Sequence, residues 1–308
     1  MTSDSLAQSS LHGWDLRCLE FRDWPCIVRF RMSASKTPVI YVHGILGNAD
    51  FWPKILPARL LSNGGTSISL PGHSTRLAKN TFGREQKGPS RPFHELDFCA
   101  AIHAAIDSLY AGTPVDLVGW STGGFAALMA ASSYPEKIRR VVSVSGFARG
   151  AWSGGLGNIQ SLAAWAATRW LVTLGLRTAS SLPRLFDRLM TQMCARQRVA
   201  ESSERQAISS IARGLRFHNM DAVVSAMSDI RGFDITNRLS QIQCPVLVIS
   251  GTHDPIIPHA EARHLASNLK NCRLVELENS GHLFFEEARD QTFSVIEQWL
   301  QITKDPDD

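Results

Sequence analysis

Leu117-Val118-Gly119-Trp120-Ser121-Thr122-Gly123-Gly124 carries the clearest structural signal in this sequence. An apolar run leads into Gly-Trp-Ser-Thr-Gly, and an Ala-rich run at 125–131 follows it. This order predicts a strand, a very tight turn and a helix, because glycines two residues before and after a serine let a strand and a helix cross closely. The serine hydroxyl is then exposed at the turn. Chance alone places such a pattern in about one of every seven to ten chains of this composition, so the rest of the sequence has to support it.

Apolar runs of strand length recur on both sides of this motif. The strands we expect lie at 38–42, 65–70, 114–119, 138–144, 244–250 and 272–277, after a predicted antiparallel hairpin at 14–21 and 26–32. The helices we expect lie at 50–61, 93–110, 125–134, 259–269 and 285–300. Alternating strands and helices predict a parallel sheet that is covered by helices on both faces. Residues 75–92 are polar, basic and rich in Gly and Pro, and we expect them to form a surface loop.

The alternation stops between about 147 and 231, where we find helical spacing and no clear strand. We therefore predict a core made of residues 1–146 and 232–308, with a helical cap inserted at 147–231. A chain of 308 residues with 44% hydrophobic residues is long enough for one α/β domain with such an insertion.

Composition and charge exclude several classes of protein. A net charge of +4, without interleaved aromatic and basic residues, gives no indication of nucleic-acid binding. We expect no secretory signal, because residues 1–10 are polar, and no transmembrane segment, because the longest apolar stretch, 162–176, is short and contains Arg169. The six cysteines lack both metal-ligand spacing and the density of a disulfide scaffold. These features predict a cytoplasmic protein without metal or cofactor, and they leave its oligomeric state open.

A catalytic serine needs an imidazole to take its proton, a carboxylate to hold the imidazole, and N–H donors for the oxyanion. Open parallel sheets place such groups after the carboxyl ends of their strands. Asp254 follows the predicted strand at 244–250, and His282 follows the strand at 272–277. The order Ser121, Asp254, His282 is the order expected for a G-x-S-x-G hydrolase, and we predict that these three residues are catalytic.

Two backbone N–H groups are the candidate oxyanion donors. Thr122 would donate from the N-terminus of the helix after the serine, and Ile45 would donate from the loop after His43. We expect His43 to shape that loop and not to react. Two other acids, Asp229 and Asp234, compete with Asp254, but they lie near the end of the cap and not after a parallel strand.

At these positions the chain resembles the α/β-hydrolase superfamily, in particular its lidded esterase and hydrolase branch. Four motifs match in order over about residues 36–300, namely His43-Gly44 with Gly47, Gly119-x-Ser121-x-Gly123, Gly251-x-x-Asp254, and Gly281-His282. The resemblance implies a mixed, mostly parallel eight-stranded sheet with helices on both faces and a helical cap over the site. The family's usual acidic residue before the loop 71–74 is absent, and Ser69 stands near its place. A serine at 121 argues against haloalkane dehalogenases and epoxide hydrolases, which carry aspartate there.

The cap is rich in arginine. Ten arginines stand between 149 and 216 (Arg149, Arg169, Arg177, Arg184, Arg188, Arg196, Arg198, Arg205, Arg213 and Arg216), against three acids (Asp187, Glu201 and Glu204). These arginines either form a solvated helical surface or attract an anionic partner. Such a partner is a carboxylate or phosphate substrate, an acyl-carrier or coenzyme A thioester, or an anionic membrane surface in peripheral contact with the cap. We expect large apolar residues of the cap to form an inner face for an acyl or ring-bearing group. They are Trp152, Trp165, Trp170, Leu171 and Phe186.

The sequence thus predicts a serine hydrolase that cleaves a small-molecule carboxylic ester or thioester with an apolar acyl part, through a Ser-His-Asp triad and an acyl-enzyme. Two alternatives stay open. In one, the same triad hydrolyses a C–C bond, a lactone or a peptide, or catalyses an elimination, on a small anionic substrate. In the other, the chain is a non-catalytic binding protein on the same fold.

Overall fold

The computed structural model describes residues 11–21, 24–32, 37–84, 91–195 and 205–301. The strands of this part of the chain form one eight-stranded sheet in the order β1-β2-β4-β3-β5-β6-β7-β8. Their bounds are β1 Asp15–Phe21, β2 Trp24–Arg31, β3 Val39–Val42, β4 Gly65–Ile68, β5 Val115–Trp120, β6 Ile138–Val144, β7 Val246–Gly251 and β8 Cys272–Leu277. Strand β2 pairs antiparallel with β1 and β4, and the other described neighbours pair parallel. The predicted mixed, mostly parallel sheet is confirmed.

The central strands are buried along their whole length, as continuous apolar runs predict for a sheet covered on both faces. Val42 of β3 lies opposite Gly119 of β5, and Trp120 lies opposite Val144 of β6. This register brings the carboxyl ends of β3, β5 and β6 to the same edge of the sheet, so the residues that follow these strands become neighbours.

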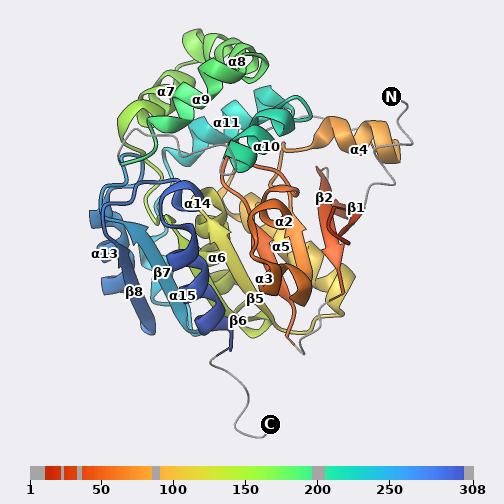
Figure 1. Ribbon diagram of the computed structural model, residues 1–308, viewed down its shortest axis with the longest axis vertical. Helices are drawn as coiled ribbons and strands as arrows, with labels where there is room; N and C mark the ends of the chain where they lie inside the picture. Colours follow the sequence, from red (N-terminus) through yellow and green to blue (C-terminus); the bar gives the residue numbers. More distant parts are fainter. Residues whose placement is uncertain (1–10, 22–23, 33–36, 85–90, 196–204, 302–308) are drawn as a thin grey trace, which may run out of the picture.

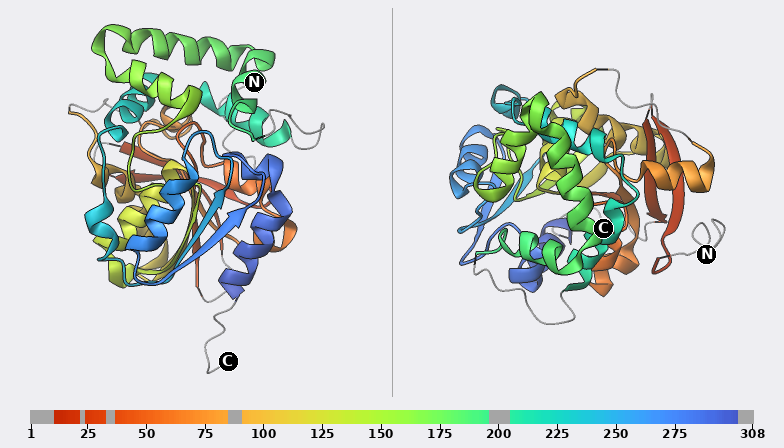
Figure 2. Two further views of the ribbon diagram at one scale, coloured as in Figure 1. Left: turned by 90° about the vertical axis from the view of Figure 1, so that its left-hand side faces the viewer. Right: turned by 90° about the horizontal axis from the view of Figure 1, so that it is seen from above.

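Helices cover both faces of the sheet. On one face lie α2 (Phe51–Ile55), α3 (Ala58–Asn63), α14 (Phe284–Glu287) and α15 (Arg289–Gln301), and on the other lie α5 (Glu95–Tyr110), α6 (Thr122–Ser133), α12 (Thr236–Leu239) and α13 (His259–Asn268) (Figures 1 and 2). A short 3₁₀ turn, η1 (Pro135–Lys137), leads into β6. Aromatic side chains join the helices of each face: Trp52 contacts Phe284 and Phe293, and Phe98 contacts Phe125.

Two expected helices are each divided in the structure. The segment at 50–61 forms α2 and α3, because Leu56 is extended (φ −57°, ψ 136°) before Pro57, a position where proline disfavours the helical conformation. The segment at 285–300 is interrupted at Ala288, where φ is −144°.

The expectation of a surface loop at 75–92 is wrong in its first half, because Thr75–Phe82 forms helix α4. Ala78 is fully buried and packs in a small apolar cluster with Ile27 and Ala49, which gives this polar segment one buried face. Gly83 ends the helix in the left-handed conformation (φ 66°). Residues 85–90 lie outside the described residues.

Between β6 and α12, the described residues form five helices and no strand, and we call this part of the chain the insertion. The helices are α7 (Gly154–Ala164), α8 (Ala166–Ser181), α9 (Pro183–Thr191), α10 (Arg205–Leu215) and α11 (Met220–Ile230). They stack at the end of the sheet where β5 ends (Figures 1 and 2). The chain leaves and returns through paired segments, because Gly150 N–H donates to Phe233 O (2.9 Å) and Ile235 N–H donates to Ala148 O (3.1 Å). The division into a core and a cap at 147 and 231 stays a prediction.

The apolar side chains of the insertion do not all face inward. Trp152 and Phe186 are buried, but Trp165, Trp170 and Leu171 lie on the outer surface, which corrects the expected inner face. The reason is that α8 is apolar around most of its circumference, and it buries another set of residues (Val172, Thr173, Leu176 and Ala179). Of the charged residues counted in the cap, Arg196, Arg198, Glu201 and Glu204 lie outside the described residues.

Candidate active site

Ser121 occupies a strained turn between β5 and α6. Its φ of 55° and ψ of −119° are rare for a residue with a side chain, and its N–H donates to Val144 O at 2.8 Å. A Cβ atom on Gly119 would collide with the carbonyl group of Gly123, and one on Gly123 would collide with the carbonyl group of Val42. The two glycines of the motif therefore allow β5, α6 and β3 to approach closely enough to hold the serine in this conformation.

The structure brings the three predicted catalytic residues together. His282 Nε2 lies 3.0 Å from Ser121 Oγ, and His282 Nδ1 lies 2.7 Å from Asp254 Oδ2. Asp254 Oδ1 accepts two further hydrogen bonds, from Ile256 N–H (2.8 Å) and Ile257 N–H (2.9 Å). Exposure is 5% for Ser121, 1% for His282 and 7% for Asp254. With Nδ1–H donating to the carboxylate, the lone pair on Nε2 faces the serine hydroxyl.

The histidine loop is held by residues that the sequence analysis did not single out. Trp120 Nε1 donates to His282 O (3.1 Å), and His282 N–H donates to Met193 O (2.8 Å). Glu287 accepts from Gly281 N–H (2.7 Å) and from Ala195 N–H (2.8 Å). The residues that follow α9 are thus hydrogen-bonded directly to the loop that carries His282. Trp120 stands inside the serine motif, but no sequence pattern connects Met193 or Glu287 to His282.

The candidate oxyanion donors lie in segments next to the serine. Thr122 is the first residue of α6, where N–H groups have no partner within the helix. A Cβ atom on Gly44 would lie 3.3 Å from the Cβ of Ser121, so the loop that carries Ile45 passes beside the serine. Among the residues that the structure describes, no backbone acceptor takes a hydrogen bond from Ile45 N–H or Thr122 N–H.

Three buried histidines pack beneath this loop. The ring centroids of His43 and His73 are 5.0 Å apart, and those of His73 and His218 are 4.7 Å apart. His43 Nδ1 donates to Gly44 O (2.7 Å), and His43 Nε2 accepts from Leu70 N–H (3.2 Å). Burial, and then the neighbouring histidines, hold the pKa values of His43 and His218 well below their usual range. His43 therefore supports the loop as a neutral side chain, in line with the shaping role that we expect for it.

The competing acids are engaged elsewhere. Asp229 accepts from Phe93 N–H (2.9 Å), and Asp234 accepts from Thr236 N–H (2.9 Å). Ser69, at the place of the family's acidic residue, accepts from Ala49 N–H (3.2 Å) and donates to Ser74 Oγ (3.2 Å).

The described residues provide neither a metal site nor a membrane span. They contain no group of three or more His, Cys, Asp or Glu side chains placed to bind a metal ion. None of their helices has the length and apolar character needed to cross a bilayer.

A small apolar cavity lies between the loop of Ile45 and the inserted helices. Its volume is about 80 Å³. Leu46 lines it from the loop, Ile256 lines it from the segment after Asp254, and residues of α7, α8 and α9 complete it (Leu156, Ile159, Leu176, Phe186, Leu189 and Met190). The cavity therefore borders the segments that carry two of the candidate site residues.

The chain is similar to several known proteins. A pimeloyl-(acyl-carrier protein) methyl ester esterase of Neisseria meningitidis serogroup C is 26% identical over 258 residues, which are 83% of this chain and 91% of that protein. The monoacylglycerol lipase ABHD6 of Homo sapiens is 22% identical over 297 residues, 94% of this chain and 82% of that protein. Among solved structures, the enol-lactonase from Burkholderia xenovorans LB400 has the same fold, with a TM-score of 0.70 and 19% identity over 92% of this chain and 100% of that one. A model of the alpha/beta hydrolase family matches residues 39–295, and the chain therefore belongs to this family and is a hydrolase.

Proposed function

We propose that this hydrolase cleaves a carboxylic ester or thioester with an apolar acyl part, using Ser121, His282 and Asp254 as its catalytic triad. The observation that carries the proposal is the hydrogen-bonded chain from Ser121 Oγ through both nitrogens of His282 to Asp254. A serine hydroxyl is a weak nucleophile at neutral pH, and an adjacent imidazole activates it by taking its proton.

The reaction then runs in two halves. Ser121 Oγ attacks the carbonyl carbon while its proton passes to His282 Nε2, and Asp254 stabilises the imidazolium that forms. The tetrahedral intermediate collapses, the alcohol or thiol leaves with the proton from His282, and an acyl-enzyme remains on Ser121. Water attacks the acyl-enzyme with His282 as base, and this step releases the carboxylic acid and the free serine.

The N–H groups of Ile45 and Thr122 are the proposed oxyanion donors. Both border the serine and are free of backbone acceptors among the described residues, and Thr122 stands at the positive end of the α6 dipole. Donors that are held in place before the reaction stabilise the developing negative charge without reorganisation, and one such donor contributes a factor of about 10² to 10³ in kcat.

The apolar cavity supports a substrate with a short acyl part. Its volume of about 80 Å³ is well below the range of about 300–1,000 Å³ that is usual for sites that enclose drug-sized ligands. The names of two relatives, a methyl ester esterase and a monoacylglycerol lipase, support ester hydrolysis over C–C cleavage, peptide hydrolysis or elimination. The complete triad geometry argues against a non-catalytic binding protein.

The test compares Ser121→Ala with Ser145→Ala, a matched control. Ser145 is also a buried serine at positive φ (48°), after the neighbouring strand β6. We expect fluorophosphonate labelling and turnover of p-nitrophenyl butyrate to disappear in Ser121→Ala and to persist in Ser145→Ala. A panel of butyryl thioester, lactone and acidic ring-cleavage substrates then separates the reaction classes. Labelling of Ser121→Ala at the wild-type rate would contradict the assigned nucleophile.

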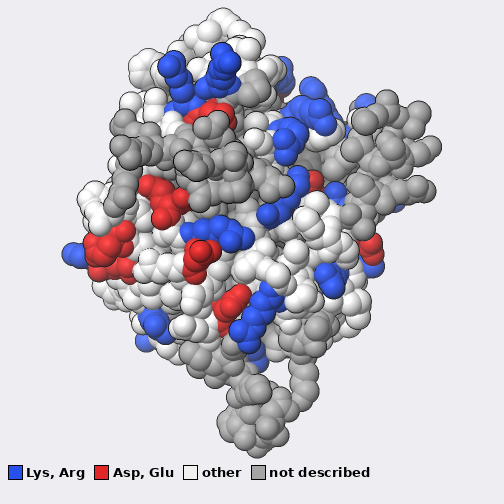
Figure 3. Space-filling model, viewed as in Figure 1, with Lys and Arg blue, Asp and Glu red and all other residues white. Residues whose placement is uncertain are grey.

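We also propose a partner for this protein in the cytoplasm, namely an anionic membrane surface. It would contact the outer surface of the insertion. Seven large apolar side chains are exposed there among the described residues (Leu162, Trp165, Trp170, Leu171, Leu174, Leu182 and Leu185). Residues 154–186 contain three arginines and no acidic residue. Tryptophan and arginine favour the boundary between lipid head groups and acyl chains. Figure 3 shows Lys and Arg side chains beside the largely uncharged end of the insertion. The six cysteines are free thiols, in keeping with a reducing compartment.

A further inference from the structure

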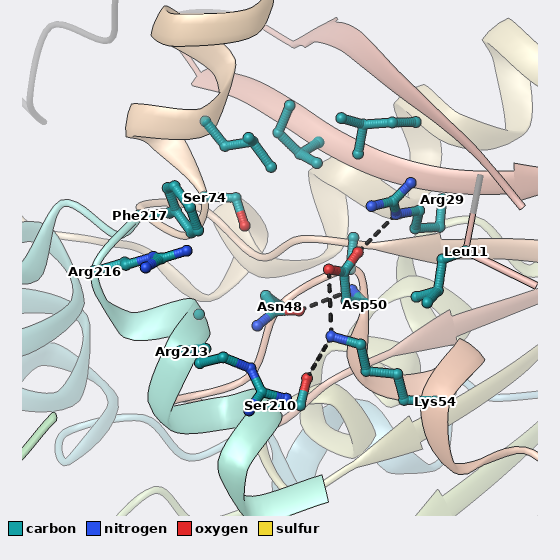
Figure 4. A pocket seen from close by; sticks show the side chains of 15 residues that line it. Leu11, Arg29, Asn48, Asp50, Lys54, Ser74, Ser210, Arg213, Arg216 and Phe217 are labelled. Atoms are coloured by element: carbon teal, nitrogen blue, oxygen red, sulfur yellow. Dashed lines mark hydrogen bonds and ion pairs between the residues drawn. The ribbon is translucent and has the colours of Figure 1, made fainter. Parts of the chain in front are cut away.

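A second cavity, of about 270 Å³, lies between α2, α4, α10 and strand β2 (Figure 4). Asn48, Ala49 and Asp50 line it, whereas Leu46 of the same loop lines the apolar cavity. Among the described residues, none lines both cavities, and neither the triad nor the proposed oxyanion donors line the second one. A ligand held here would therefore not be the molecule that Ser121 attacks.

Positive charge is in excess in this cavity. Four cationic side chains line it (Arg29, Lys54, Arg213 and Arg216), and Asp50 is the one acid among the described lining residues. Asp50 is already engaged, because its Oδ1 accepts from Arg29 Nε at 2.6 Å. Lys and Arg side chains also predominate over α10 and α2 in the surface view (Figure 3).

The cations that remain are poorly neutralised. Lys54 Nζ lies 3.6 Å from Asp50 and donates to Ser210 Oγ at 2.9 Å. Arg213 makes no hydrogen bond or ion pair with any residue that the structure describes, and Figure 4 shows it beside Ser210 and Lys54. Burial lowers the pKa of Lys54, and the proximity of Arg213 and Arg29 lowers it further, although Asp50 opposes the shift. An anion between Lys54 and Arg213 would relieve this repulsion.

Another part of the cavity wall is apolar. Ile27 and Ala49 belong to a small hydrophobic cluster that is separate from the main core, and Leu16 and Leu77 pack against it. All four side chains also line the cavity. One part of the cavity is therefore suited to an oxyanion, and another is suited to a few methylene groups.

We propose that this cavity binds a small amphipathic anion, with its carboxylate or phosphate-monoester head held by Lys54, Ser210 and Arg213 and its short apolar body against Leu16, Ile27 and Leu77. Both head groups present oxygens that ammonium and guanidinium groups bind through charge-assisted hydrogen bonds. The volume, slightly below the usual range for ligand sites, restricts the ligand to a short chain. The inference is independent of the proposed ester hydrolysis.

Isothermal titration calorimetry of the full chain tests the proposal with four probes: hexanoate, hexyl phosphate, inorganic phosphate and hexanol. We expect hexanoate or hexyl phosphate to bind and inorganic phosphate to bind more weakly. Any binding heat measured with hexanol should be the same in the wild type and in Arg213→Ala. The comparison of hexanoate with hexyl phosphate identifies the head group. Arg213→Ala should lower the affinity about tenfold, and Arg213→Lys should recover part of it.

Controls make the assignment to this cavity specific. Arg177→Ala removes an exposed arginine of α8 that pairs with Asp221 (3.2 Å), and it should bind like the wild type. Ser121→Ala should also bind unchanged, because Ser121 does not line the cavity. Arg213 is exposed, so its loss should leave the thermal unfolding curve unchanged. Equal affinity of Arg213→Ala and wild type, or the absence of binding by both amphipathic anions, would overturn the proposal.

Discussion

Helices α6 and α8 are both largely apolar and both lack acidic residues, but they differ in what surrounds them. Ten of the twelve residues of α6 are buried, whereas four of the sixteen residues of α8 are. Helix α6 packs against β3, β5, β6 and α5, while α8 lies at the outer edge of the insertion on α7, α9, α10 and α11 (Figure 2). Apolar composition therefore predicts burial only where neighbouring elements are available to cover the helix.

This difference has a functional consequence. The first residues of α6 belong to the turn that holds Ser121, so substitutions around α6 should impair catalysis or stability. Trp170, Leu171 and Leu174 of α8 are exposed, so substitutions there should affect neither catalysis nor stability and should act on contacts with a partner.

The largest effect is expected at the acid that orients the catalytic histidine. Asp254→Asn should lower kcat/KM for p-nitrophenyl butyrate by about 10³- to 10⁴-fold, because an amide favours the wrong tautomer of His282. The matched control is Asp234→Asn, which changes a turn aspartate near the end of the insertion that accepts from Thr236 N–H. Steady-state kinetics with both variants would contradict the assignment if they lost activity equally.

A second prediction concerns the core side of α6. Phe125 is fully buried and stacks against Phe147 (centroids 5.2 Å apart) and Phe233 (5.9 Å). Phe125→Ala should reduce the free energy of unfolding by about 3–5 kcal/mol, because it removes this packing and leaves a cavity. Leu174 in α8 is 54% exposed, so Leu174→Ala should change the free energy of unfolding by less than about 0.5 kcal/mol. Urea unfolding of both variants measures the contrast, and equal losses would refute it.

The sequence predicted the α6 region well because its requirements are local or depend on a common rule. Gly119 and Gly123 are needed for the close crossing at the turn, and continuous apolar runs mark the buried strands. Because parallel strands end at one edge of the sheet, the residues after β7 and β8 could be expected to meet Ser121. The positions of Asp254 and His282 follow from that rule, although they are far from the serine in sequence.

The insertion follows no such rule. Nothing in the sequence of α8 distinguishes Trp170, which is exposed, from Val172, which is buried, because the answer depends on how α7 and α11 pack beneath the helix. The bridge from Glu287 to Gly281 and Ala195 depends on the same packing. Helix α4 was missed for another reason: only Thr75 and Ala78 of its residues are buried, and its remaining composition is typical of a loop.

A third prediction concerns the link between the two regions. His43 and His73 belong to the core, and His218 follows α10 in the insertion. Their pKa values are lowered in the folded protein, chiefly by burial, whereas the unfolded chain takes up protons below about pH 6.5. The contribution of the three neutral histidines to the free energy of unfolding is thus fully present above pH 6.5. It is lost as the pH falls towards the lowered pKa values.

Urea unfolding at pH 7.5, 6.5 and 5.5 should show this loss. The free energy of unfolding should depend less steeply on pH in His218→Asn. The lowered pKa values of Asp107, Asp234 and Glu276 affect stability only in a more acidic range, below the usual pKa of carboxylates, so they do not mask the effect. Equal stability at the three pH values, or the same slope in the variant, would show that the histidines do not link the core to the insertion.

The smallest effect on the folded protein is expected at the outer face of α8. Trp170→Ser should leave the free energy of unfolding within about 0.5 kcal/mol of the wild type, because the side chain is 61% exposed. The same change should lower binding to phosphatidylglycerol vesicles by about tenfold, with a further loss on adding Trp165→Ser. Phe82→Ser is the matched control, since Phe82 is an exposed aromatic residue (37%) outside the insertion.

Phosphatidylcholine vesicles separate the two contributions to this binding, because they keep the apolar interior and lack the net negative charge. Weak sedimentation with phosphatidylcholine and strong sedimentation with phosphatidylglycerol would assign the difference to the arginines of the insertion. If Trp170→Ser and Phe82→Ser sedimented alike, the exposed apolar face of α8 would not be a membrane contact. If Trp170→Ser instead destabilised the fold by several kcal/mol, α8 would be covered within the protein as α6 is, and the contrast between the two helices would fail.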